Sequence, residues 1–161
     1  MATTTATPTS TTTWKLDPAH SSAEFKVRHM MISNVRGSLT GLTGVLNENT
    51  ADPALSSVEA IVDVSTLSTG DAQRDGHLKS PDFFEVEKYP TMTFKSTSVK
   101  RTGQGEYSVT GDLTMHGVTK PVTFAVEGPS APGKDPWGNT RIGLSATTRS
   151  IARTSDRKSV V

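Results

Sequence analysis

The stretch YSVTGDLTMHGVTKPVTFAVEG, residues 107–128, contains two alternating runs joined by a short connection. One face of these runs collects Tyr107, Val109, Leu113 and Met115, followed by Val122, Phe124 and Val126. Successive side chains of a strand point to opposite faces, so each run predicts a strand with one apolar face. The HGVTK segment between the runs predicts a tight turn, and the whole stretch therefore predicts an antiparallel hairpin.

Similar alternation recurs on both sides of this hairpin. The other predicted strands cover residues 23–31, 38–48, 58–67, 91–99 and 141–148. Only 33% of the residues are hydrophobic, and they stand in short runs between Gly, Pro, Asn and Asp, which is typical of antiparallel sheets with one solvated face. About seven strands with one helical insert predict a sandwich or a barrel.

The helical insert is expected where the period of the pattern changes, in residues 68–90. Ser68 or Thr69 can cap a short helix that ends near Leu78. Ser80, which precedes a proline, can cap one further turn. The insert is too short to form a second domain.

The charge and composition of the chain exclude several classes of function. The formal net charge is +1, from 17 basic and 16 acidic residues, so neither nucleic acid nor an anionic membrane surface is expected as a partner. Cysteine is absent, so any chemistry would depend on histidines, carboxylates and hydroxyls. No apolar run is long enough for a transmembrane helix, and stable membrane insertion is not expected.

The length of 161 residues suits a single domain with a real core. Residues 1–13, MATTTATPTSTTT, are expected to form a disordered tail because Thr and Pro cannot bury apolar surface here. The same residues lack the basic start and the apolar centre of a signal peptide. As the sequence is written, the cytoplasm is therefore the expected compartment.

The residues predicted to face inward combine Met and Phe with small side chains. They are Met31, Met92, Met115, Phe25, Phe94 and Phe124, with Ala23, Ala60, Gly111 and Ala146 among them. Small residues on the inner face of a barrel leave room, which Met and Phe line adaptably. A barrel filled by its own side chains explains the composition equally well, so an interaction module with a dry interior stays open as an interpretation.

Long ordered motifs add to this alternation. They are LDPAHSSAEFKVRHMMISNVRGSL (16–39), STGDAQRDGHLKSPDFFEVEKYPTMTFKSTSV (68–99), GDLTMHGVTKPVTFAVEG (111–128) and DPWGNTRIGLSATT (135–148). On these motifs the chain resembles the YceI-like family of polyisoprenoid-binding, lipocalin-like proteins. The resemblance implies that residues 14–148 form an antiparallel lipocalin-like β-barrel of about eight strands. It also implies a helix packed against the barrel and a long apolar tunnel that holds an isoprenoid chain.

The function that the resemblance implies is a non-catalytic carrier for a long isoprenoid lipid with a quinone or polyprenyl phosphate head. No cofactor is expected apart from such a bound lipid. The residues expected to line the tunnel are Phe25, Val27, Val62, Phe94, Leu113, Met115 and Phe124, with His29 or Arg74 at the polar head. Members of the family are often periplasmic or secreted, which conflicts with the cytoplasmic expectation from the N-terminus.

The histidines are the first candidates for chemistry. They are His20, His29, His77 and His116, and they have neither HxH nor HExxH spacing, so no metal site is expected. His116 precedes Gly117 and is expected to fix a tight turn rather than to act in catalysis. His29 shares a face with apolar residues, so it needs a hydrogen bond either within the core or to a ligand head group.

The rival function is a small hydrolase or isomerase that uses the same cavity. It would combine His29, His77 or His116 with Asp75 as acid and base. Asp75 can equally form an exposed pair with Arg74, and pairs of this kind are usually inert. No serine stands in a GxSxG context, so nucleophilic hydrolysis is not expected.

The C-terminal segment 149–161, RSIARTSDRKSVV, departs from the last strand of the family, which usually reads like TINRxDFG. A coding sequence for TINRTDFG that loses its first base can be read as RSIARTS, which is residues 149–155. We interpret the segment as the product of a single-base deletion after Thr148, which resequencing of the gene would test. Such a frameshift would disrupt the last strand, and the resulting open edge would favour a homodimer.

Overall fold

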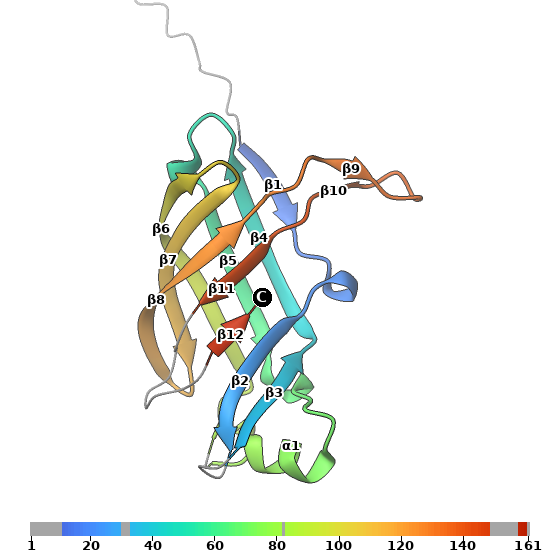
Figure 1. Cartoon of the computed structure of the whole chain (residues 1–161), viewed down its shortest axis with the longest axis vertical. Coiled ribbons are helices and arrows are strands. Elements are labelled where there is room, and N and C mark those ends of the chain that lie inside the picture. Colours follow the sequence, from blue (N-terminus) through green and yellow to red (C-terminus); the bar gives the residue numbers. More distant parts are fainter. Residues whose placement is uncertain (1–10, 30–32, 82, 149–157, 161) are drawn as a thin grey trace, which may run out of the picture.

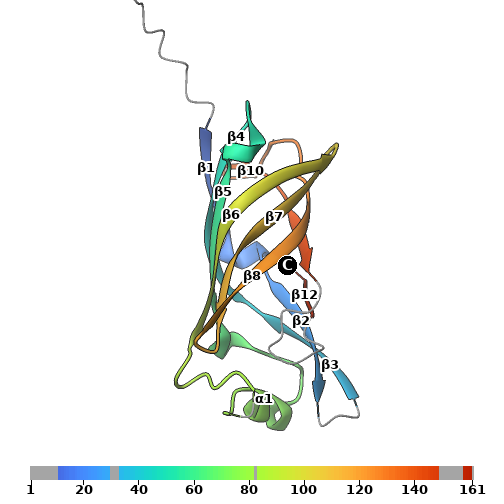
Figure 2. The same cartoon turned by 90° about the vertical axis from the view of Figure 1, so that its left-hand side faces the viewer.

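The computed structural model describes residues 11–29, 33–81, 83–148 and 158–160, and for residues 27–29, 33–34 and 158–160 it describes the backbone alone. Within these residues the protein is mostly β, as predicted. A ten-stranded antiparallel sheet curls around a central space into a half-barrel (Figures 1 and 2).

The strands of the large sheet are β1 (Thr11–Lys15), β2 (Ala23–His29), β3 (Ser33–Leu39), β4 (Gly41–Asn49), β5 (Ser57–Asp63), β6 (Thr91–Gly103), β7 (Glu106–Met115), β8 (Val118–Glu127), β11 (Ser145–Thr148) and β12 (Lys158–Val160). Their order across the sheet is β1-β4-β5-β6-β7-β8-β11-β12-β2-β3. A separate two-stranded arm pairs β9 (Gly133–Lys134) with β10 (Thr140–Arg141). The helical elements are η1 (Pro18–His20), η2 (Pro53–Leu55), η3 (Val64–Thr66) and α1 (Ala72–Leu78).

The hairpin predicted first from the sequence is present as β7 and β8. Val109 faces Phe124 across the pair, and Tyr107 faces Val126, so the apolar residues of both strands share one face of the sheet. His116 and Gly117 form the turn with positive φ values of 54° and 72°. Glycine adopts such angles without strain, whereas histidine needs local contacts to hold them.

Several of the expected boundaries are wrong. The strand expected at 58–67 ends at Asp63, and the strand expected at 141–148 is divided between β10 and β11. Thr11 to Thr13, assigned to the tail, pair with Asn47 to Asn49 of β4, and the hydroxyl of Thr13 donates a hydrogen bond to Oδ1 of Asn47 at 2.9 Å. The single strand expected at 38–48 is divided between β3 and β4. The sequence pattern predicts neither β1 nor most of β3. With the C-terminal β12 these strands raise the number in the large sheet to ten, above the expected value of about eight.

The helix α1 ends at Leu78 as predicted, but its predicted cap is wrong. Asp71 caps it, because one carboxylate oxygen accepts hydrogen bonds from the backbone N–H groups of Gln73 and Arg74 at 3.0 and 3.1 Å. The backbone of Ser68 pairs instead with Ser38 of β3. No helix in the described residues is both long and apolar enough to cross a membrane.

A buried apolar cluster closes the barrel at the α1 end. It includes Leu39, Leu42, Val64, Leu67, Leu78 and Phe84. Leu78 of the helix is 0% exposed, and Phe84 meets Phe25 edge to face with ring centroids 5.8 Å apart. The helix and the segment after it therefore act as a plug beneath the sheet (Figures 1 and 2).

The altered C-terminal segment still supplies a short strand to the sheet. Ser159 in β12 pairs with Thr148 of β11 and with Phe25 of β2, so β12 joins these two strands. The expectation that the closing strand is lost is therefore wrong for residues 158–160. Residues 149–157, which carry most of the proposed frameshift, lie outside the described residues.

Candidate ligand cavity

A cavity of about 1890 Å³ runs along the inner face of the curled sheet. At the α1 end its lining residues, such as Leu39, Leu42 and Phe84, are buried. At the opposite end its lining residues, such as Thr12 and Pro129, are exposed. The cavity is therefore sealed beneath by the plug and open at the end where β1 begins and β8 ends.

Most of the residues predicted to line the tunnel do line this cavity. They are Phe25, Val62, Phe94, Leu113, Met115 and Phe124. Their strands are neighbours in the sheet or face one another across it, so residues far apart in the sequence share one apolar surface. Contact with a ligand remains a prediction for each of them.

The remaining predicted residues are placed differently. Val27 and His29 belong to β2, but their side chains lie outside the described part of the structure. Arg74 belongs to α1 and donates two hydrogen bonds to Thr69, from Nε to the hydroxyl and from Nη2 to the carbonyl, both at 2.9 Å. Arg74 thus holds the loop before the helix, and within the described residues it is not part of the cavity wall.

The aromatic rings lie against the wall because glycines face them on neighbouring strands. A Cβ atom at Gly37 would stand 2.3 Å from Cζ of Phe25, and one at Gly111 would stand 2.7 Å from Cζ of Phe94. The space beside Gly111 is therefore occupied by the ring of Phe94, which corrects the expectation that it is left free. Phe94 also meets Phe124 edge to face at 5.0 Å.

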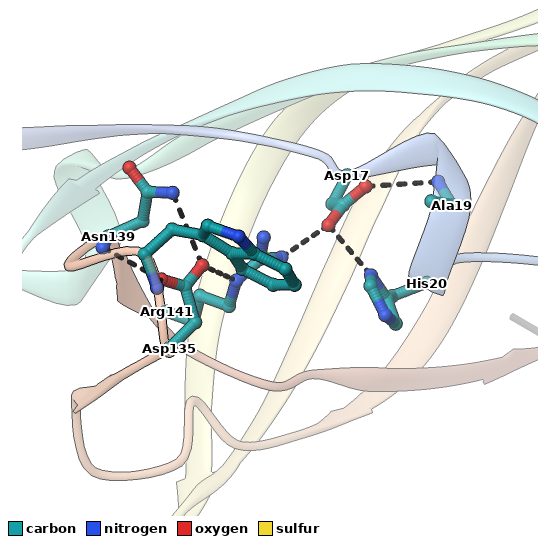
Figure 3. A network of polar contacts seen from close by, with 7 residues as sticks. Asp17, Ala19, His20, Asp135, Asn139 and Arg141 are labelled. Atoms are coloured by element: carbon teal, nitrogen blue, oxygen red, sulfur yellow. Dashed lines mark hydrogen bonds and ion pairs between the residues drawn. The ribbon is translucent and has the colours of Figure 1, made fainter.

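A polar network at the open end was not predicted from the sequence (Figure 3). Arg141 of β10 forms an ion pair through Nη1 with Oδ2 of Asp17, and its Nε donates to Oδ2 of Asp135 at 2.7 Å. Nδ1 of His20 lies 2.9 Å from the same Asp17 oxygen, and Asn139 donates to Asp135. All five residues line the cavity, so its mouth is polar whereas its walls are apolar.

The guanidinium group fixes the charges of this network. The hydrogen bond from Arg141 lowers the pKa of Asp17 well below its usual range, and it lowers the pKa of Asp135 from 3.8 to about 2. The two carboxylates in turn raise the pKa of Arg141, with Asp17 the larger cause. At neutral pH Asp17, Asp135 and Arg141 are therefore all ionised, and both carboxylates engage the same cation.

His116 lies at the other end of the sheet. Its Nε2 is 3.1 Å from Oε2 of Glu85, and its ring centroid is 4.8 Å from that of Tyr89. These contacts tie the β7–β8 turn to the segment that follows α1. The position agrees with a structural role in the turn.

The other groups of the rival enzyme lie around α1. Asp75 accepts hydrogen bonds from the backbone N–H and the hydroxyl of Thr69 at 2.8 and 2.5 Å, and the ring of His77 meets that of Phe83 at 5.1 Å. In the described residues neither of them, nor His116, lines the cavity. The described residues also contain no group of three or more His, Asp or Glu side chains that could hold a metal ion.

Comparison with protein families supports the resemblance seen in the motifs. The model of the YceI-like domain matches residues 14–154. A UPF0312 protein of Vibrio parahaemolyticus is 44% identical over 131 residues, which cover 81% of this chain and 69% of that protein. A UPF0312 protein of Pseudomonas putida is 43% identical over 129 residues, which cover 80% of this chain and 67% of that protein.

Solved structures with the same fold include a YceI protein of Campylobacter jejuni, with 31% identity, a TM-score of 0.63, and coverage of 82% of this chain and 77% of that one. BcnA of Burkholderia cenocepacia has 24% identity and a TM-score of 0.64, with the same coverage. A polyisoprenoid-binding domain from Saccharophagus degradans has 17% identity and a TM-score of 0.52, over 80% of this chain and 70% of that one. The last two comparisons show a shared fold.

Proposed function

Because the chain belongs to the YceI-like family, we propose that it is a non-catalytic carrier that holds a long isoprenoid lipid in the barrel cavity. The observation that carries the proposal is the size and lining of the cavity, about 1890 Å³ bounded by the apolar inner face of the sheet. No cofactor besides this lipid is proposed.

The volume of the cavity indicates a ligand longer than an ordinary metabolite. Pockets for small molecules typically measure about 300–1000 Å³, which is well below the volume found here. Each buried methylene contributes about 0.8 kcal/mol, so a tail of several prenyl units can offset the cost of association without strong polar contacts. The polyisoprenoid-binding domain from S. degradans has the same fold, which supports this class of ligand.

The contacts within the polar network at the mouth favour a quinone over a polyprenyl phosphate as the head group; Lys15, a cation outside the network, also lines the cavity. A phosphate needs a cation that is available for charge-assisted hydrogen bonds. Arg141 is the cation of the network, and it already bonds to the carboxylates of Asp17 and Asp135. An anionic head would meet these two charges, whereas the carbonyl oxygens of a quinone carry no charge to repel.

Native mass spectrometry of the protein purified from its own host, followed by solvent extraction, tests the proposal. We expect one isoprenoid lipid per protein molecule, and extraction would identify its head group. A folded protein that carries no lipid and binds none when long-chain isoprenoid quinones are added would contradict the carrier function.

A substitution within the cavity gives a second test. Met115 lines the cavity, and Met115→Trp would place a larger ring in the space of the tail. We expect the variant to keep its fold and to bind an isoprenoid quinone at least about tenfold more weakly. Equal affinity in a folded variant would mean that the tail lies elsewhere.

A further inference from the structure

The open end of the barrel carries the two most exposed large apolar side chains of the described residues. Trp137 is 78% exposed and Leu55 is 69% exposed. Trp137 stands in the turn of the β9–β10 arm, and Leu55 belongs to η2 in the β4–β5 connection. Both segments lie at the end of the molecule away from α1 (Figures 1 and 2), and residues of both line the cavity mouth.

Asp135 holds the turn that presents Trp137 in one shape; Figure 3 shows its contacts with Asn139 and Arg141. One carboxylate oxygen accepts from the backbone N–H groups of Trp137 and Asn139, each at 2.9 Å. The other accepts from Nδ2 of Asn139 at 3.2 Å and from Nε of Arg141 at 2.7 Å. Arg141 in turn ties the arm to Asp17 beside the mouth. An exposed tryptophan on so ordered a turn loses little conformational freedom when it docks.

From these features we propose that the open end docks on a lipid bilayer surface, with Trp137 and Leu55 entering the interface beside the cavity mouth. The inference rests on the carrier function, because a long apolar lipid resides in a bilayer when it is not in the protein. Tryptophan is the side chain that membrane proteins place at the interface, with its ring among the acyl chains and its N–H in the headgroup region.

The composition of the surface favours a bilayer over a protein partner. A stable protein interface buries about 800 Å² on each side around a packed apolar centre. Here two apolar side chains stand on separate segments at the open end, which matches shallow insertion into a fluid surface. The net charge of the chain is only +1, so apolar insertion and not electrostatic attraction is expected to supply the binding.

The experiment is sedimentation with vesicles of phosphatidylcholine alone and of phosphatidylcholine mixed with phosphatidylglycerol. We expect similar binding to both and little effect of salt. Trp137→Ala should lower the partition onto vesicles about tenfold and Leu55→Ala roughly threefold, because each removes apolar surface from the interface. Ile61→Ala is the matched control: Ile61 is 48% exposed but lies on β5, outside these two segments, and its loss should change nothing.

Intrinsic fluorescence identifies the side chain that enters the bilayer. The chain has two tryptophans, and Trp14 in β1 is half-buried with no hydrogen-bond partner for its buried Nε1 among the described residues. We expect vesicles to shift the emission of the Trp14→Phe variant to the blue and to leave the emission of the Trp137→Phe variant unchanged.

The outcomes separate this inference from the carrier function. Lipid in the purified protein without vesicle binding would overturn the docking and leave the carrier. Vesicle binding through Trp137 by a protein that carries no lipid would support the docking and contradict the carrier. Binding to anionic vesicles alone, equal binding by the Trp137→Ala variant, or self-association through Trp137 in place of vesicle binding would each overturn the docking.

Discussion

The two ends of the barrel are built from the same sheet but from different chemistry. At the α1 end, Leu78 and Phe84 are buried in an apolar cluster that excludes water. At the open end, Asp17, Asp135 and Arg141 form an ion network and Trp137 faces solvent. The contrast separates two tasks that a barrel with a cavity must perform. The α1 end contributes the apolar burial that the hollow centre lacks. The open end stays accessible to solvent.

The sharpest test of this division is a pair of identical changes at the two ends. Leu78→Ala should lower the free energy of unfolding by about 2–5 kcal/mol, because it leaves a void in a fully buried site. Leu55→Ala, at a site that is 69% exposed, should change it by less than about 0.5 kcal/mol. Urea denaturation measures both, and similar losses in the two variants would contradict the assignment of stability to the α1 end.

A second pair of changes tests the middle of the barrel, where the sheet separates cavity from solvent. Ala60 and Ile61 are neighbours on β5; Ala60 lines the cavity and Ile61 is 48% exposed on the other face. Ala60→Trp should weaken the binding of an isoprenoid quinone at least about tenfold, since the ring takes the space of several buried methylenes. Ile61→Trp should leave the affinity unchanged.

Thermal unfolding of both tryptophan variants shows whether the fold is kept, and calorimetric titration with the quinone gives the affinities. Equal weakening in the two variants would mean that the effect comes from the strand and not from its inner face.

The smallest expected effect concerns the charges of the open end. Asp17 and Asp135 have pKa values below the ordinary value of 3.8, and that of Asp135 is about 2. At pH values between the lowered pKa values and the ordinary one, the unfolded chain therefore binds more protons than the folded chain. The free energy of unfolding consequently rises with pH in this range. The contribution of the network is present above about pH 4 and is lost as the pH falls through the lowered pKa values.

Arg141→Gln removes the cation that lowers the pKa values of Asp17 and Asp135. The loss of stability as the pH falls below about 4 should therefore become smaller. Arg101→Gln, which removes an exposed arginine from β6, is the control and should keep the wild-type dependence. Denaturation midpoints measured across this pH range compare the three proteins. An unchanged dependence in Arg141→Gln would show that the network contributes nothing to acid stability.

The parts of the fold that sequence could predict are those with a complete local pattern. The strands β5 to β8 alternate large apolar and polar side chains, and all four were expected. In β3 the alternation is interrupted at Gly37, because the ring of Phe25 on β2 supplies the apolar surface there. The missing side chain is provided by another strand, so the pattern of β3 alone could not reveal it.

The candidate site, too, contains residues that the sequence could predict and residues that it could not. Six residues on the inner face, among them Phe94 and Met115, were found by their phase in the strands. The ion network was not, because Asp17 and Arg141 are separated by 124 positions and no local spacing shows that their two motifs meet. The resemblance predicts a head-group contact for Arg74, whereas the donors of Arg74 bond to Thr69, which lies in the loop before its own helix.

The strand order has a consequence for the way in which the molecule assembles. From β4 to β8 the order in the sheet is the order in the chain, so each strand pairs with the next one along the chain. The closures are short, and therefore fast, except for the connection 64–90 between β5 and β6, which contains α1. The contact between Asp17 and Arg141 joins residues 124 positions apart and needs a much longer closure. We therefore expect refolding to produce a curved shell first and to complete the mouth last, so that the capacity to retain a lipid appears later than the secondary structure.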